Sequence, residues 1–279
     1  MAHTHFVLAG IMGWPVSHSR SPQIHNHWIA EHALNGAYVL LPVEPARLPD
    51  AVRGLAALGF AGCNVTIPHK VAAMSLVDWV DPLARRIGAI NTIVVQPDGS
   101  TRGYNNDGAG YLQSLQEAQP GWRAGSGPAM VLGAGGGARA VIASLAQAGA
   151  PEIRVCNRSF DKAQALAQEL GGPLRAVPWE QRHEALGGAT LLVNTTNQGM
   201  TGQPALDLSL DALGAEALVS DLVYVPLETA LLAAARARGN QIVGGLGMLL
   251  HQARPAFHAW FGVMPQVTPE LRRRIVATL

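Results

Sequence analysis

Lys70 is the residue of this sequence whose type and position first suggest chemistry. It closes the stretch Gly62-Cys63-Asn64-Val65-Thr66-Ile67-Pro68-His69-Lys70, which begins as an apolar, β-prone segment. Pro68 removes a backbone donor and fixes φ, so we expect a strand to end there and a helix to begin, with Lys70 in its first turn. Ligands bind at strand ends in α/β proteins, and a cation is disfavoured at a helix N-terminus. A surface lysine on an exposed turn is the ordinary alternative.

Asp107 offers a carboxylate in a second turn-rich stretch, residues 103–110, that precedes a helical pattern. A helix N-cap explains an aspartate at this point without any chemistry. If the fold brings Asp107 to Lys70, the carboxylate orients the ammonium while the lysine exchanges a proton with a substrate oxygen. Burial and the helix terminus lower a lysine pKa and a carboxylate raises it, so the sequence leaves the net direction open.

Two serines, Ser19 and Ser21, precede Pro22, which opens a helical pattern. Residues two apart in an extended segment face the same way, so these hydroxyls lie side by side. Together with the backbone N–H groups of a helix start they make a cradle for an anion. The alternative is that Ser21 serves only as the N-cap of its helix.

A glycine turn, Gly133-Ala134-Gly135-Gly136-Gly137, lies between an apolar strand at 129–132 and a helix at 139–147. This order is typical of dinucleotide-binding units, although the spacing is not a strict G-x-G-x-x-G. The next strand, 153–156, is followed by Arg158 and Lys162 and not by an acidic residue, which favours the 2′-phosphate of NADP over the ribose hydroxyls of NAD. Solvated residues at a helix start are the alternative explanation for these two cations.

The strands and helices expected around these residues alternate along the chain. This alternation predicts a two-domain α/β protein with mostly parallel sheets. The N-terminal α/β part would be the substrate domain, and the glycine turn would belong to a Rossmann-like dinucleotide-binding domain. Strands are expected at 6–12, 38–43, 62–67, 88–95, 129–132, 153–156, 189–193 and 217–222, and helices from 22, at 47–58, 71–79, 139–147 and within 248–279.

Composition narrows the class of protein further. The chain has 279 residues, enough for about two domains, with 48% hydrophobic and 14% charged residues and a net charge of +1. This balance indicates neither nucleic-acid nor membrane binding. The two cysteines lack metal spacing and fit a reducing compartment, the ten histidines are scattered, and no signal peptide is recognised. We therefore expect no metal, a cytoplasmic location, and a monomer or homodimer.

The motifs occur in an order that resembles the shikimate dehydrogenases over nearly the whole chain. The matching segments are Ser19-Arg20-Ser21-Pro22, Asn64-Val65-Thr66-Ile67-Pro68-His69-Lys70, Gly88-Ala89-Ile90-Asn91-Thr92, Asn105-Asn106-Asp107-Gly108, Gly133-Ala134-Gly135-Gly136, Asn157-Arg158-Ser159, residues 221–227 and residues 245–253. Each segment alone is weak, but eight in family order are specific.

The resemblance implies a substrate domain of residues 1–106 and 245–279, with an NADP domain of residues 107–244 inserted between them. The implied reaction is the reversible, NADPH-dependent reduction of 3-dehydroshikimate to shikimate in aromatic amino-acid biosynthesis. Carried over by position, the catalytic residues are Lys70 and Asp107, and the substrate-binding residues are Ser19, Ser21, Thr66, Lys70, Asn91, Asp107, Tyr224 and Gln252. The implied cofactor-binding residues are Gly133, Ala134, Gly135, Gly136, Gly137, Asn157, Arg158, Ser159, Lys162, Thr195, Leu222, Gly245 and Met248.

This chain departs from the family pattern at two positions. Asn106 replaces the usual threonine before Asp107, and Lys162 replaces an arginine, which keeps the charge but loses the planar fork. The alternatives are a relative acting on quinate or an amino analogue, and a nucleotide-binding sensor without catalysis. The presence of both Lys70 and Asp107 favours an enzyme.

Overall fold

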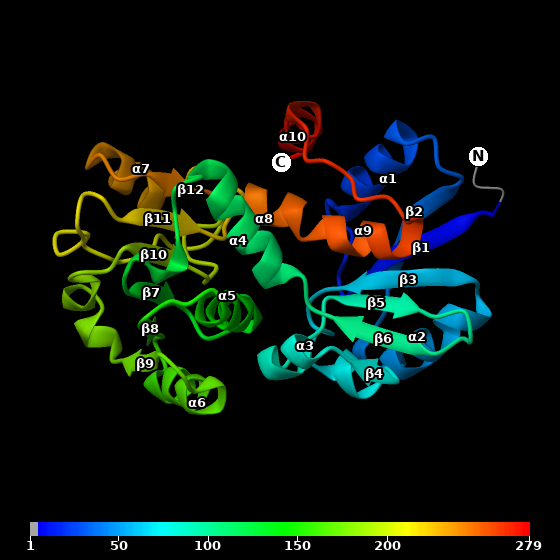
Figure 1. Cartoon of the computed structure of the whole chain (residues 1–279), viewed down its shortest axis with the longest axis horizontal. Coiled ribbons are helices and arrows are strands. Elements are labelled where there is room, and N and C mark those ends of the chain that lie inside the picture. The colour runs from blue at the N-terminus through cyan, green and yellow to red at the C-terminus, as the bar shows by residue number, and fades with distance from the viewer. Residues whose placement is uncertain (1–4) are drawn as a thin grey trace. The chain divides into compact units, whose positions relative to one another are not determined.

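The computed structural model describes residues 5–279 and divides the chain into two compact units (Figure 1). Unit 1 contains the chain up to Asn106 and its last segment, Leu250–Leu279, and unit 2 contains Asp107–Leu249. The first crossing coincides with the expected boundary after residue 106. The second lies five residues beyond the expected 244/245, because it falls inside helix α8 (Leu246–His251).

Unit 1 is built on a six-stranded sheet of order β2-β1-β3-β5-β6-β4. Its strands are β1 (Val7–Gly13), β2 (Gly36–Pro42), β3 (Phe60–Val65), β4 (Trp79–Val80), β5 (Thr92–Val95) and β6 (Thr101–Tyr104). Its helices are α1 (Ser21–Glu31), α2 (Leu48–Ala57), α3 (Pro82–Ile87), α9 (Ala253–Phe261) and α10 (Pro269–Val276), with short 3-10 turns η1 (Pro45–Arg47) and η2 (Ala72–Ser75). The sheet is mixed, because β5 pairs antiparallel with both β3 and β6.

Different side chains cover the two faces of the unit 1 sheet. Aliphatic residues of α2, among them Val52 and Leu55, pack with Val65 and Ile93 of the strands in one cluster. An aromatic group joins α1, β2 and α9; its members are His25, Trp28, Tyr38, Phe257 and Trp260. The C-terminal helices are therefore part of the unit 1 core.

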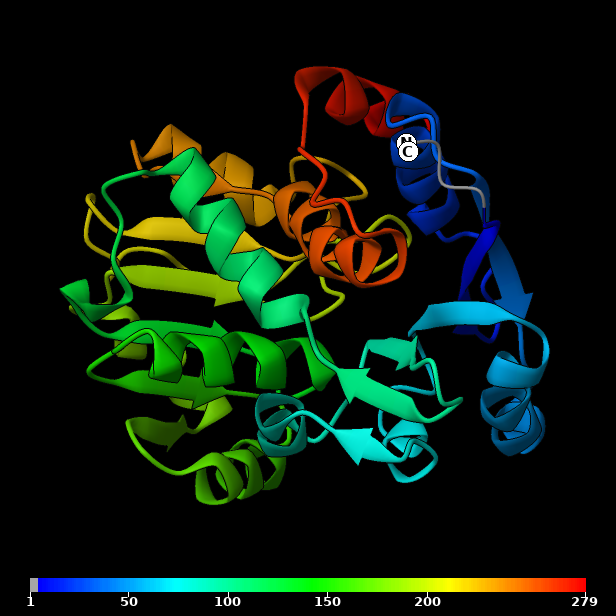
Figure 2. The same cartoon turned by 45° about the vertical axis from the view of Figure 1, so that its right-hand side comes forward.

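Unit 2 contains a six-stranded sheet of order β12-β11-β10-β7-β8-β9, and all its pairings are parallel. Its strands are β7 (Ala129–Leu132), β8 (Ile153–Cys156), β9 (Leu174–Val177), β10 (Leu191–Asn194), β11 (Leu218–Asp221) and β12 (Ile242–Val243). Its helices are α4 (Asp107–Ala118), α5 (Gly136–Gln147), α6 (Phe160–Leu170) and α7 (Ala230–Ala237), with 3-10 turns η3 (Ala124–Ser126), η4 (Trp179–Gln181) and η5 (Glu184–Leu186). Figure 2 shows neighbouring strands of this sheet running in one direction.

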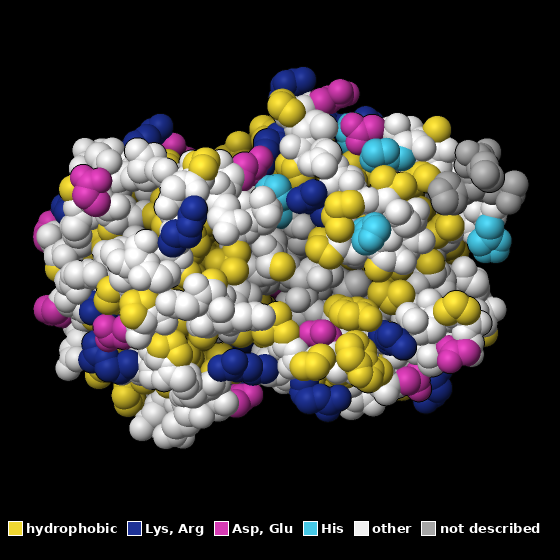
Figure 3. All heavy atoms as spheres, in the orientation of Figure 1, with side chains coloured by type: hydrophobic (Ala, Val, Ile, Leu, Met, Phe, Trp, Pro, Cys, Tyr) yellow, Lys and Arg dark blue, Asp and Glu magenta, His cyan; other side chains and the backbone are white. Residues whose placement is uncertain are grey.

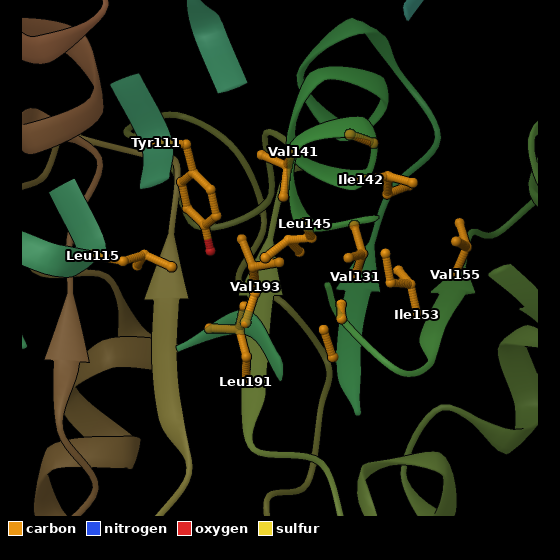
Figure 4. Packing of buried hydrophobic residues seen from close by; sticks show 14 of the residues in the cluster. Tyr111, Leu115, Val131, Val141, Ile142, Leu145, Ile153, Val155, Leu191 and Val193 are labelled. Atoms are coloured by element: carbon orange, nitrogen blue, oxygen red, sulfur yellow. The ribbon is translucent and has the colours of Figure 1, made fainter. Parts of the chain in front are cut away.

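Successive side chains of the unit 2 strands point to opposite faces of the sheet, so the core of this unit has two layers. Val131, Val155 and Val193 face a cluster that includes Tyr111 of α4 and Leu145 of α5, as Figure 4 shows. The intervening strand residues belong to a second cluster that includes α7. A sheet buried on both faces leaves the strand ends as the place for polar loops.

Candidate functional site

Ends of four strands meet at one edge of the unit 1 sheet. β1 and β3 are parallel, and Met12 pairs with Val65, so the chain leaves both strands at the same edge. β5 enters at that edge because it runs antiparallel to β3, and β6 leaves there because it runs antiparallel to β5. The predicted substrate residues Ser19, Ser21, Thr66, Lys70 and Asn91 all lie in segments that begin or end at this edge.

Lys70 lies in a turn and not in the helix expected from 71 to 79. After β3 the chain makes a turn through residues 67–71 and then only the short 3-10 turn η2. The turn is held by the backbone, because the Ile90 N–H donates to the Lys70 carbonyl at 2.9 Å. Buried His69 anchors it as well, since its Nε2 donates to the Val43 carbonyl, an obligate acceptor, at 2.7 Å. The backbone of Lys70 is thus fixed beside Asn91.

The two serines are close together, but Ser21 is not the N-cap of α1. The helix begins at Ser21 and Arg20 holds the cap position without a side-chain cap bond. The Ser19 hydroxyl accepts from the Ser21 N–H at 3.2 Å, so it satisfies one orphan donor of the helix start. The expectation of a pure capping role for Ser21 is therefore wrong.

Asn91 and Gln252 are in direct contact although they are far apart in the sequence. Asn91 Nδ2 donates to Gln252 Oε1 at 3.3 Å, and Gln252 precedes α9. Thr66 is joined to β1, because its N–H donates to the Met12 carbonyl at 2.9 Å. Unit 1 therefore gathers hydroxyl and amide groups and the Lys70 turn from four segments of the chain.

Asp107 is the next residue after Asn106, which is hydrogen-bonded at this end of the unit 1 sheet. The backbone N–H of Asn106 donates to Asn91 Oδ1 at 3.0 Å, and Asp107 follows as the first residue of α4. Adjacent Cα atoms are about 3.8 Å apart, so the covalent chain alone keeps the Asp107 backbone near the hydrogen-bonded Asn106. Its assignment as the partner of Lys70 stays a prediction.

The glycine turn of unit 2 follows β7 at Leu132 as predicted, but α5 begins at Gly136, three residues before the expected start at Arg139. Gly133 has φ +111, and a Cβ there would lie 2.5 Å from Thr195 Oγ1, so only glycine fits. The Thr195 hydroxyl is itself fixed, because it donates to the Leu132 carbonyl at 2.6 Å. At Gly135 and Gly136 a Cβ would meet nothing within 4 Å, which leaves the backbone open to a ligand.

A pocket of about 220 Å³ opens beside this turn. Six predicted cofactor residues line it: Gly133, Ala134, Gly135, Asn157, Arg158 and Thr195. Four further lining residues were not among the predicted ones: Trp179, Thr196, Asn197 and Gln198. Ser159 and Lys162 are exposed at the start of α6 and are not among the lining residues.

Trp179 is the aromatic residue among the lining residues that were not predicted. It follows β9, and the Arg182 guanidinium lies over its ring, 4.7 Å from the ring centroid. Arg182 is held by the side chain and carbonyl of Asp207 and by the Trp179 carbonyl. The tryptophan ring is therefore braced on one side. The sequence did contain a signal, because an aromatic residue stands just after β9, the next strand after Arg158.

Four other predicted cofactor residues lie around one loop of unit 2. A Cβ on Gly245 would lie 2.0 Å from the Leu222 carbonyl oxygen, and one on Gly137 would touch Leu222 Cδ1 at 3.4 Å. Met248 packs with Leu222 against the core beneath α4 and α5. Tyr224 lies two residues past Leu222, half-buried in the loop before α7. The roles predicted for these residues stay predictions.

These features of unit 2 fit a dinucleotide. The turn has open backbone at two glycines, a helix that starts beside them, and Arg158 at the carboxyl end of the neighbouring strand. Backbone N–H groups at a helix N-terminus favour phosphate, and an arginine suits an added 2′-phosphate.

Three further observations concern surface charge, membrane spans and metal sites in the described part of the chain. Figure 3 shows basic and acidic side chains interspersed on the face in view. Among residues 5–279, no helix has the length and apolar character that crossing a membrane requires. Within the same range, no group of three His, Cys, Asp or Glu side chains is placed to hold a metal ion.

A parallel sheet with a glycine turn after β7, in one chain with a second α/β unit of polar strand ends, defines the class of dinucleotide-dependent oxidoreductases. Residues 11–93 match the family model of the shikimate dehydrogenase substrate binding domain, and residues 119–201 match that of the shikimate / quinate 5-dehydrogenases. The chain belongs to the shikimate dehydrogenase family, as the motifs predicted.

Similar proteins agree over the full length. A protein of Paramagnetospirillum magneticum named shikimate dehydrogenase (NADP(+)) is 57% identical, over 97% of this chain and 98% of its own. A shikimate 5-dehydrogenase of Thermus thermophilus, solved with NADP(H) and shikimate, is 39% identical with a TM-score of 0.87, covering 98% of this chain and 100% of that one. A quinate dehydrogenase of Corynebacterium glutamicum, solved with NAD, is 30% identical with a TM-score of 0.91 and the same coverages.

Proposed function

We propose that this protein catalyses the reversible, NADP-dependent oxidation of shikimate to 3-dehydroshikimate. The observation that carries the proposal is the pairing of two sites in one chain. Unit 1 gathers polar groups suited to a hydroxylated carboxylate, and unit 2 has a glycine-lined pocket with an arginine. Two of the similar proteins are named for shikimate and NADP.

In this proposal the side chains of unit 1 hold the substrate. Ser19 and Ser21 bind its carboxylate from the start of α1, where backbone N–H groups and the helix dipole favour an anion. Thr66, Asn91 and Gln252 bind ring hydroxyls. The hydrogen bond between the amides of Asn91 and Gln252 fixes these two side chains relative to each other. Tyr224 completes the carboxylate site.

Lys70 carries the proton in the proposed reaction. In the oxidation direction its amine takes the proton of the reacting hydroxyl. NADP⁺ bound at the glycine turn would supply the hydride acceptor for the same carbon. Asp107 orients the lysine and stabilises the ammonium that forms. The turn that fixes the Lys70 backbone through Ile90 gives the proton carrier a defined starting position.

Arg158 selects the cofactor. It lines the pocket beside Asn157 at the end of β8, where NAD-binding proteins of this fold hold an acidic residue. A guanidinium forms a charge-assisted pair with the 2′-phosphate of NADP, which the ribose hydroxyl of NAD cannot offer. Quinate oxidation with NAD is the second candidate, because a relative solved with NAD is named for quinate.

Steady-state kinetics with shikimate and quinate, each with NADP⁺ and NAD⁺, test the proposal. We expect the highest kcat/KM for shikimate with NADP⁺, measured from the absorbance of the reduced nicotinamide. Equal values for the two cofactors would contradict the role of Arg158. Absence of turnover with all four pairs would instead support a nucleotide-binding sensor.

Two further expectations belong to this proposal. We expect a monomer or homodimer, which light scattering distinguishes. We also expect a cytoplasmic location; Cys63 and Cys156 are both buried free thiols, which agrees with a reducing compartment.

A further inference from the structure

Three buried polar side chains of unit 1 have no role in the site described so far. Tyr38, Asn64 and Thr92 are exposed by 2%, 4% and 1%. Burying such groups is costly unless each is hydrogen-bonded. Their bonds form a chain, with Tyr38 Oη to Asn64 Oδ1 at 2.7 Å, Asn64 Nδ2 to Thr92 Oγ1 at 3.2 Å, and Thr92 Oγ1 to Asn91 Oδ1 at 2.9 Å. The chain ends at a proposed substrate residue.

The direction of this chain is fixed at the Asn91 end. The Asn106 backbone N–H lies 3.0 Å from Asn91 Oδ1, and an N–H can only donate, so this atom is the amide oxygen. The Thr92 hydroxyl must therefore donate its one hydrogen to the same oxygen. Its lone pairs accept from Asn64 Nδ2 at 3.2 Å and from Asn106 Nδ2 at 3.0 Å. The Thr92 hydroxyl is fully used.

The direction is fixed at the other end as well. Asn64 Nδ2 donates to the Asn91 main-chain carbonyl at 3.1 Å, and a carbonyl only accepts, so the Asn64 amide has one orientation. Its Oδ1 accepts from the Tyr38 phenol. The phenol therefore donates and the Asn64 oxygen accepts, which fixes the first bond of the chain.

All hydrogens in the chain thus point from Tyr38 toward Asn91, whose Nδ2 then donates to Gln252. Two donors on Asn91 Oδ1 hold its amide in one of the two possible orientations. The Asn91 amide is therefore held with its oxygen toward Thr92 and Asn106 and its Nδ2 toward Gln252.

We propose that Thr92 is a positioning residue for substrate binding, acting through the Asn91 amide, with Tyr38 in the same role one step further back through Asn64. The inference rests on the proposed function, since it concerns the substrate side of that reaction. Loss of the Thr92 hydroxyl removes one of the two donors that orient Asn91, and it leaves the amide hydrogens of Asn64 and Asn106 without that acceptor.

Thr92→Val tests this with little change in shape. We expect KM for shikimate to rise about tenfold, the effect of about one lost hydrogen bond, with KM for NADP⁺ within twofold of the wild type. Thr92→Ser keeps the hydroxyl and should restore KM to within threefold. Tyr38→Phe should raise KM for shikimate by a smaller factor, and it decides the question if Thr92→Val does not fold.

Thr101→Val is the matched control. Thr101 is a buried threonine of the same unit, at the opposite end of β6, and its hydroxyl donates to Asp78 at 2.8 Å. We expect it to lower Tm without changing KM for shikimate. An unchanged KM for shikimate in Thr92→Val, an equal rise for both substrates, or the same rise in Thr101→Val would overturn the inference. A wild type without shikimate turnover would refute the proposed function itself, before any variant is compared.

Discussion

The two units present polar groups at the ends of their strands in different ways. In unit 1 the edge is built from side chains, and amides and hydroxyls such as Asn64, Thr92 and Asn91 fix one another by hydrogen bonds. In unit 2 the edge is built from backbone, and Gly133 and Gly135 bring the main chain to the pocket surface. Unit 1 should therefore be most sensitive to the loss of polar atoms, and unit 2 to the addition of a Cβ.

Lys70→Ala should have the largest effect on activity. General acid–base groups contribute about 10²–10⁴-fold to rate, so we expect kcat to fall within that range. KM for shikimate should change little, because the lysine acts mainly on the proton. Initial rates of NADP⁺ reduction measure both parameters, and a variant with near-normal kcat would show that Lys70 is not the proton carrier.

The sequence contains one other lysine, Lys162, and it lies in unit 2. It is exposed near the start of α6 and outside the lining of the pocket. Lys162→Ala should leave kcat unchanged and raise KM for NADP⁺ by at most a few-fold. An equal loss of kcat in both variants would mean that removal of positive charge, and not proton transfer, explains the effect at Lys70.

Gly133→Ala and Gly135→Ala separate folding from binding in unit 2. At Gly133 the new Cβ lies 2.5 Å from the fixed Thr195 hydroxyl at φ +111, so we expect unfolding to become easier by about 1–3 kcal/mol. At Gly135 φ is −84 and the Cβ meets nothing, so Tm should stay unchanged. KM for NADP⁺ should rise about tenfold there, since the methyl group occupies space that a phosphate needs. Equal Tm losses in both variants would contradict this division.

Local signals predicted the elements of unit 2 well. The strands 153–156 and 129–132 occur with the expected bounds, because short apolar runs flanked by turn residues are determined by nearby sequence. The helix expected after Lys70 is instead a four-residue 3-10 turn, Ala72–Ser75, held by tertiary contacts such as that of His69 with Val43. Propensity within a short segment gave way to packing.

The polar chain of unit 1 was beyond sequence reasoning for a different reason. Tyr38, Asn64 and Thr92 belong to three strands, and they meet only through the order β2-β1-β3-β5 and its register. Trp179 similarly reaches the pocket from the segment after β9. An asparagine inside an apolar strand was the visible signal, since buried polar residues need a partner.

His25 makes unit 1 sensitive to acid. Complete burial lowers the pKa of its imidazole to about 3, against a weaker opposing effect of the Asn64 side chain. The folded state therefore favours neutral His25, and this contribution is complete above pH 6.5 and is lost as the pH falls toward 3. Between pH 7 and 5 it removes about 2 kcal/mol of stability.

His25→Phe should flatten that dependence while it keeps an aromatic ring on Tyr38, which now stacks at 4.1 Å between centroids. Urea unfolding at pH 7 and pH 5 measures the difference. Asp221 of unit 2 changes in the opposite sense, because burial raises the pKa of its carboxyl and the folded state then favours the protonated form as the pH falls. Parallel pH profiles for His25→Phe and the wild type would show that another group carries the acid sensitivity.

Each unit has a tryptophan beneath an arginine, and the tryptophan of unit 2 lines the pocket beside the glycine turn. Arg102 lies 5.6 Å from the ring centroid of Trp79 in unit 1, and Arg182 lies 4.7 Å from that of Trp179 in unit 2. A base stacked on an aromatic ring gains about 1–3 kcal/mol. If Trp179 is a platform for the adenine of the cofactor, Trp179→Ala should raise KM for NADP⁺ about tenfold with unchanged kcat, and Trp179→Phe by less than threefold.

Trp79→Ala removes the same kind of pair from a surface outside the predicted site. We expect it to leave KM for NADP⁺ and for shikimate unchanged, whatever its effect on Tm. Because both variants lose an arginine-covered ring, their comparison isolates the pocket as the variable. Equal changes of KM in Trp79→Ala and Trp179→Ala would mean that the ring supports the fold and does not contact the cofactor.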